Sequence, residues 1–114
     1  MTGFVRVLTL ADLPPGTAKQ VEIDGRKIAV VNARGTVYAI DDTCTHENES
    51  LSEGPVVGEI IACPKHGSRF HLVTGRVLSL PAVRPVNTYA VKVEGEDILL
   101  SPEPRPGQGM PHKR

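Results

Sequence analysis

Two short segments of this chain each combine one cysteine with one histidine. The first is Cys44-Thr45-His46 and the second is Cys63-Pro64-Lys65-His66, with sixteen residues between them. Each segment offers one thiolate and one imidazole, and both are good ligands for transition metals. Two such loops can hold a metal centre from opposite sides, provided that the fold brings them together. This requirement constrains the fold more than any other feature of the sequence.

Three chemistries fit two cysteines and two histidines. Zinc takes four such ligands, but zinc fingers usually group the cysteines together and the histidines together, whereas each segment here mixes the types. A disulfide between Cys44 and Cys63 would leave the histidines on the surface, although sparse cysteines near histidines are more typical of metal binding. A mixed-ligand [2Fe–2S] cluster needs two thiolates on one iron and two imidazoles on the other. The pattern therefore favours the cluster, with zinc and the disulfide as alternatives.

The rest of the chain shows the alternation of apolar and polar residues that is typical of β-strands. Strands are expected within residues 4–8, 21–23, 27–31, 37–40, 89–93 and 98–100. Asp24-Gly25 is a two-residue hairpin signal, and further turns are expected at residues 33–35 and 95–97. Eleven glycines and ten prolines favour many turns over long helices. We therefore expect an all-β fold, an antiparallel sandwich or barrel, with residues 41–67 inserted as a functional segment.

Length and charge exclude several classes of function. A chain of 114 residues suits one domain. Thirteen basic residues balance thirteen acidic ones, which gives no basis for nucleic-acid binding. No apolar run is long enough to cross a membrane, and the N-terminus lacks a signal-peptide pattern, so we expect a cytoplasmic protein with no membrane partner. Residues 101–114 contain four prolines and two glycines and are expected to form a flexible tail.

The ligand segments and their surroundings resemble the Rieske iron–sulfur domain. The residues that carry the resemblance are the four in the ligand pairs together with Leu51, Gly54, Gly67, Phe70, Thr74, Gly75 and Pro81. The resemblance spans nearly the whole chain and implies a β-sandwich over residues 1–100, with a small cluster-binding subdomain whose loops lie at about 41–54 and 62–70. It also implies one [2Fe–2S] cluster, with Cys44 and Cys63 on the buried iron and His46 and His66 on the outer iron.

Since we expect one domain and no further one, the chain resembles the stand-alone Rieske ferredoxins of bacterial ring-hydroxylating dioxygenase systems. The resemblance then implies a one-electron carrier, and not an enzyme, that accepts electrons from a reductase and donates them to a terminal oxygenase. We expect it to be a monomer when free. The alternative is a small Rieske-type subunit of a larger reductase, such as nitrite reductase.

Several residues differ from the Rieske proteins of respiratory complexes. Those proteins carry an extra cysteine in each loop, and these form a disulfide that braces the cluster; here the matching places are not cysteine. They also place a serine and a tyrosine after the second loop; here Ser68 is kept, but Phe70 replaces the tyrosine. Hydrogen bonds to the sulfurs raise the potential of such a cluster, so we expect a value in the lower half of roughly −150 to +300 mV. His71 is expected to be structural, and residues 81–83 resemble the third loop, which covers the cluster.

Six acidic residues lie between Arg34 and Lys65 with no basic residue among them, namely Asp41, Asp42, Glu47, Glu49, Glu53 and Glu59. This acidic run is either a solvated face or a docking surface for a partner that presents basic residues.

Overall fold

Strand β3 (Arg26–Ala33) lies at the centre of the fold and is buried on both faces. The structure is a computed structural model that describes residues 3–45, 49–65, 67–79 and 84–107. Successive side chains of a strand point to opposite faces. Ile28 and Val30 therefore enter one core cluster, whereas Ala29 and Val31 enter the other. Burial on both faces explains why residues 28–31 form an unbroken apolar run.

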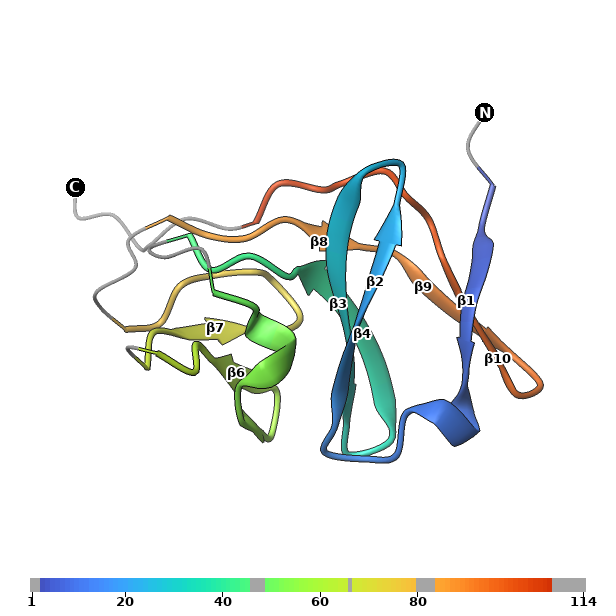
Figure 1. The fold of residues 1–114 in the computed structure, drawn as a ribbon, viewed down its shortest axis with the longest axis horizontal. Coiled ribbons are helices and arrows are strands. Elements are labelled where there is room, and N and C mark those ends of the chain that lie inside the picture. The colour runs from blue at the N-terminus through green and yellow to red at the C-terminus, as the bar shows by residue number, and fades with distance from the viewer. Residues whose placement is uncertain (1–2, 46–48, 66, 80–83, 108–114) are drawn as a thin grey trace.

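Two larger antiparallel sheets form the sandwich. In the first sheet, β3 pairs with β2 (Ala18–Ile23) and β4 (Thr36–Asp41), and β4 pairs in turn with β8 (Thr88–Tyr89). In the second, β10 (Asp97–Leu100) lies between β1 (Val5–Thr9) and β9 (Val91–Glu94). A short 3₁₀ helix, η1 (Leu10–Asp12), follows β1. Figure 1 shows the four-stranded sheet in the middle of the molecule and the three-stranded sheet at its right.

A third, smaller sheet lies on the other side of the four-stranded sheet (Figure 1). It consists of β5 (Val56–Val57), β6 (Ile60–Ala62) and β7 (Arg69–His71), and the 3₁₀ helix η2 (Leu51–Glu53) precedes it. Its register places Val56, Ile61 and Phe70 in one row across the three strands. This row packs into the core cluster that also contains Ala29 and Val31. The small sheet is therefore held to the sandwich by its apolar inner face.

The three predicted turns are present, although those expected at 33–35 and 95–97 are one residue shorter, because Ala33 and Asp97 are already paired in strands. Asp24 and Gly25 have φ angles of 52° and 78° and connect the paired residues Ile23 and Arg26. Two positive φ angles define the type I′ turn that matches the twist of a hairpin. All strand pairs are antiparallel and the described residues form no α-helix, so the expected all-β sandwich with a small subdomain is confirmed.

The C-terminal segment differs in part from the expected tail. Residues 101–107 continue along the domain, and Arg105 exchanges two backbone hydrogen bonds with Thr88, of 2.8 and 2.9 Å. Gly107 lies so close to Val86 that a Cβ atom on it would be 2.0 Å from the carbonyl oxygen of Val86. This segment is therefore anchored along β8. The prediction of a flexible tail remains only for residues 108–114, which lie outside the described residues.

Candidate metal centre

The first ligand segment begins where β4 ends. Cys44 follows that strand by three residues, and its N–H donates a 3.0 Å hydrogen bond to the carbonyl of Glu49. Thr43 and Ser50 form an isolated antiparallel bridge, so the two ends of the segment between them lie side by side. Residues 44–49 are thus a closed loop that starts from a strand of the central sheet. His46 and Glu47 lie in this loop but outside the described residues.

The second ligand segment connects β6 to β7. Cys63 directly follows β6, and its N–H donates a 2.7 Å hydrogen bond to the carbonyl of Ser68. The N–H of Gly67 returns a 3.0 Å hydrogen bond to the carbonyl of Cys63, and Gly67 has a φ angle of 78°, which favours glycine. The segment is therefore a tight hairpin loop with its cysteine at the base. His66 lies outside the described residues.

The fold brings the two cysteines into one core. Both have a relative exposure of 2%, and both belong to the cluster between the four-stranded sheet and the small sheet. They are not joined in a disulfide, which disfavours that alternative. Two buried thiols at the bases of two adjacent loops are the donors that the inner iron of a mixed-ligand cluster requires. The two described thiols therefore fit the cysteine half of a mixed-ligand [2Fe–2S] site.

Gly54 explains how the two loops come close together. A Cβ atom at this position would lie 1.8 Å from the carbonyl oxygen of Ala62, the last residue of β6. The φ angle of Gly54 is −92°, so glycine is needed here for the close approach and not for the backbone conformation. The chain that returns from the first ligand loop through η2 therefore packs, at Gly54, directly against the strand that leads into Cys63.

Two polar contacts link the ligand loops to each other and to the segment that follows the third loop. Lys65 Nζ lies 3.8 Å from Glu49 Oε2, which pairs the second ligand loop with the first. Thr45 Oγ1 donates a 2.7 Å hydrogen bond to the carbonyl of Arg84. Residues 81–83, the expected third loop, lie outside the described residues, but Arg84 immediately follows them. The first ligand loop therefore contacts both the second ligand loop and the residue that follows the expected third loop.

Three members of the acidic run, two at its start and one at its end, accept hydrogen bonds from other parts of the fold. Asp42 has a relative exposure of 1% and accepts three hydrogen bonds. Asp41 accepts hydrogen bonds from the Tyr89 hydroxyl and the Asn87 N–H. Glu59 accepts a 3.2 Å hydrogen bond from the hydroxyl of Tyr38. Among the described members of the run, only Glu49 and Glu53 remain beside the ligand loops as candidates for a docking surface.

Ser68, Phe70 and His71 follow the second ligand loop, and the structure describes the surroundings of each. Ser68 and Phe70 are both completely buried, and Phe70 belongs to the same core cluster as the cysteines. His71 Nδ1 accepts a 3.2 Å hydrogen bond from the N–H of Val73, and Nε2 lies 3.8 Å from Glu59 Oε1. These contacts agree with the structural role expected for His71. The structural role of Asp42 could not be predicted, because a doublet of aspartates gives no signal that one of them is buried.

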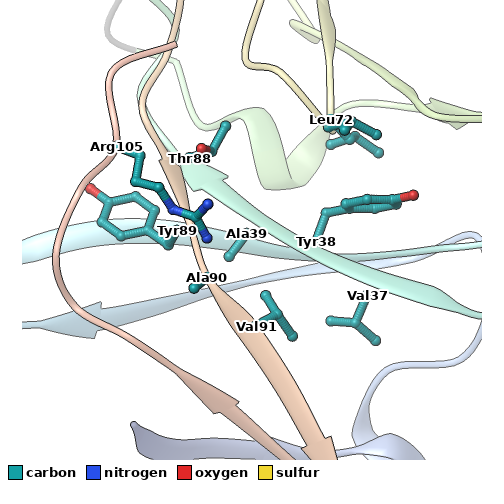
Figure 2. A pocket seen from close by; sticks show the side chains of 10 residues that line it. Val37, Tyr38, Ala39, Leu72, Thr88, Tyr89, Ala90, Val91 and Arg105 are labelled. Atoms are coloured by element: carbon teal, nitrogen blue, oxygen red, sulfur yellow. The ribbon is translucent and has the colours of Figure 1, made fainter. Parts of the chain in front are cut away.

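A groove of about 220 Å³ lies elsewhere on the molecule, along β4, β8 and β9. Figure 2 shows its tyrosines, Tyr38 and Tyr89, with the Arg105 side chain extending across the β8 side. Burial raises the pKa of the Tyr38 hydroxyl, and the hydrogen bond to Glu59 adds to the effect. The groove contains neither cysteine, so it is not part of the metal centre.

Comparison with known proteins identifies the family. Residues 3–90 match the Rieske [2Fe-2S] domain family. The chain is 38% identical over 98 residues to the biphenyl dioxygenase ferredoxin subunit of Pseudomonas sp. (strain KKS102), covering 85% of this chain and 90% of the relative. The chain therefore belongs to the Rieske [2Fe–2S] family, and the predictions of a Rieske domain and a [2Fe–2S] cofactor are confirmed.

Solved structures point to the same kind of protein. The ferredoxin of carbazole 1,9a-dioxygenase from Nocardioides aromaticivorans IC177 is 40% identical, with a TM-score of 0.83 over 88% of this chain and 98% of that one. A chain in a complex of oxygenase and ferredoxin of carbazole 1,9a-dioxygenase is 35% identical, with a TM-score of 0.84 over 90% of this chain and 95% of that one. The prediction of a ferredoxin-type electron carrier is confirmed.

The alternative of a reductase subunit has weaker support. The small subunit of an NADH-dependent nitrite reductase from Mycobacterium tuberculosis is 21% identical, with a TM-score of 0.80 over 89% of this chain and 96% of that one. Similarity at this level shows a shared fold alone.

Proposed function

We propose that this chain carries single electrons from a reductase to the terminal oxygenase of a ring-hydroxylating dioxygenase system. The observation that carries the proposal is the pair of buried thiols, Cys44 and Cys63, in one core at the bases of two neighbouring loops. Full-length similarity to ferredoxin components supports the assignment to a carrier. We place this carrier and its partners in the cytoplasm; no helix among the described residues is long and apolar enough to cross a membrane.

The ligand assignment is part of this proposal. Cys44 and Cys63 would hold the inner iron, and His46 and His66 would hold the outer iron. A [2Fe–2S] cluster supplies one-electron redox chemistry when bound, so the protein needs no general acid, base or nucleophile of its own. The chain contributes a buried thiolate pair, loops closed by backbone hydrogen bonds, and a core that excludes water from the cysteines.

Metal analysis tests the ligand assignment. Aerobically purified protein should contain about two irons and two acid-labile sulfides per chain, and reduced protein should give the EPR signal of mixed cysteine and histidine ligation. Cys63→Ala, His46→Ala and His66→Ala should each lose iron, because each removes a metal ligand. His71→Ala is the matched control, since His71 contacts Glu59 and Val73, and it should retain iron. Stoichiometric zinc without sulfide would contradict the proposal.

Measurements of electron transfer with purified reductase and oxygenase test the proposed partners. The purified chain should be reduced by a dioxygenase-system reductase and should then support turnover by an oxygenase of the same system. Stable co-purification with a large catalytic reductase subunit would instead favour the nitrite-reductase type of assembly.

A further inference from the structure

Asp42 is a buried carboxylate just before the first ligand loop. Its side chain accepts hydrogen bonds from Gln20 Nε2 at 2.5 Å, Ser50 Oγ at 2.5 Å and the N–H of Ser52 at 2.7 Å. Its relative exposure is 1%, and within the described part of the chain it forms no ion pair. A buried charge is costly unless it is well hydrogen-bonded. The three donors meet that requirement.

The partners of Asp42 belong to two different parts of the fold. Gln20 lies on β2, and the backbone N–H of Asp42 donates a 3.0 Å hydrogen bond to the carbonyl of Lys27 on β3. Ser50 and Ser52 lie directly after the first ligand loop, at the start of η2, where the N–H of Leu51 also donates to the Asp42 carbonyl at 2.6 Å. One residue therefore fastens both ends of the loop that contains Cys44 to the central sheet.

We propose that Asp42 is a positioning residue that closes the first ligand loop and that its buried negative charge lowers the reduction potential of the metal centre. The inference rests on the proposed ligand set, because Asp42 is two residues from Cys44. Reduction adds a negative charge to an iron–sulfur centre, and net charge nearby is one determinant of its potential. A carboxylate that water does not screen acts more strongly than an exposed one.

The neighbouring residue provides a matched control. Asp41 also carries a carboxylate, but it is only half-buried and its partners lie elsewhere. It accepts hydrogen bonds from the hydroxyl of Tyr89 at 2.6 Å and from the N–H of Asn87 at 3.0 Å. Asp41 therefore holds β4 to β8, whereas Asp42 holds β2 and β3 to the ligand loop. Changing either one removes one charge from the same strand end.

The experiment compares Asp42→Asn, Asp42→Ala, Asp41→Asn and Gln20→Leu in cluster-containing protein. Asp42→Asn keeps the shape but not the charge, so it should retain two irons per chain and show a higher midpoint potential. Asp42→Ala also leaves buried donors without an acceptor and should lose iron to a chelator about tenfold faster than wild type. Gln20→Leu should accelerate iron loss less, because it removes one of the three bonds. Asp41→Asn should lower the free energy of unfolding while shifting the potential less than Asp42→Asn.

The outcomes separate this inference from the proposed function. Wild-type protein without a [2Fe–2S] centre would contradict the proposed function itself. Wild-type protein with the centre, but unchanged potential and iron loss in both Asp42 variants, would overturn the inference alone. Equal shifts of the midpoint potential in Asp41→Asn and Asp42→Asn would also overturn the inference. The shift would then come from removing any charge near the end of β4, and not from the buried position of Asp42. If Asp42→Ala fails to fold, Asp42→Asn and Gln20→Leu still decide the question.

Discussion

The hydroxyl of Tyr89 donates a 2.6 Å hydrogen bond to Oδ1 of Asp41. Tyr89 is the last residue of β8, and Asp41 is the last residue of β4. Asn87 donates its N–H to the other carboxylate oxygen of Asp41 at 3.0 Å, so the carboxylate joins the two strand ends twice. The first ligand loop leaves from this point, and β8 follows the expected third loop. The bond therefore ties the base of the first ligand loop to the strand that follows the expected third loop.

Removing this hydroxyl should destabilise the fold. Tyr89→Phe keeps the ring in the core but leaves Asp41 with one donor fewer, and a hydrogen bond to a charged group contributes about 1.5–3 kcal/mol. We expect the free energy of unfolding, measured by urea titration at pH 8, to fall by about that amount. Tyr38→Phe is the control, because its hydroxyl bonds to the exposed Glu59 and should change stability less. Equal effects of the two substitutions would contradict this prediction.

The same bond predicts a dependence on alkaline pH. Burial raises the pKa of Tyr89, and the hydrogen bond to Asp41 raises it further. Above about pH 10 a tyrosine in the unfolded chain loses its proton, whereas folded Tyr89 keeps it. The unfolded state then binds fewer protons, so the free energy of unfolding decreases as the pH rises. Urea titrations at pH 9 and pH 11 should show this decrease to be smaller in Tyr89→Phe than in wild type.

Gly54→Ala should separate the two ligand loops. The added methyl group would lie 1.8 Å from the carbonyl oxygen of Ala62, a backbone atom that cannot move without displacing β6. Overpacking of this kind costs about 1–3 kcal/mol or more. We expect reduced iron content and faster iron loss, measured against Gly3→Ala, because a Cβ atom at Gly3 meets nothing within 4 Å. Full iron retention in Gly54→Ala would show that the loops do not depend on this contact.

The C-terminal segment should stabilise β8. A chain that ends at Leu100 lacks the two hydrogen bonds between Arg105 and Thr88 and the contact of Gly107 with Val86. Two backbone hydrogen bonds contribute about 1–3 kcal/mol together. We expect a lower free energy of unfolding and faster amide exchange at Thr88, compared with a chain that ends at Gly107. Equal stability of the two truncated chains would show that residues 101–107 contribute nothing to the domain.

The strand pattern could be predicted because its signals are local. The hairpin at Asp24-Gly25 follows from residues that tolerate positive φ, and the apolar run at 28–31 follows from burial on both faces. The role of Asp42 could not be predicted in the same way. Its donors, Gln20 and Ser52, lie 22 and 10 residues away in the sequence, so only the folded chain brings them together. For the same reason the acidic run looked uniform in the sequence, although Asp42 is internal and Glu53 is exposed.

The acidic residues beside the ligand loops are expected to guide the approach of a redox partner. A transient redox partner binds a small, polar interface, and exposed charges steer its approach within about 8 Å at physiological salt. Glu49 is partly exposed beside the ligand loops, and its carboxylate lies 3.8 Å from Lys65 Nζ. Reversing the charge of Glu49 therefore also removes that ion pair. We expect Glu47→Lys combined with Glu49→Lys to slow association with the reductase, in stopped-flow experiments, more than it changes the potential. Glu94→Lys is the control, because Glu94 pairs with Lys92 on β9, in the sheet that does not contact the cysteine core. An association rate that does not depend on salt between about 0.05 and 0.5 M would show that these acids are solvated surface only.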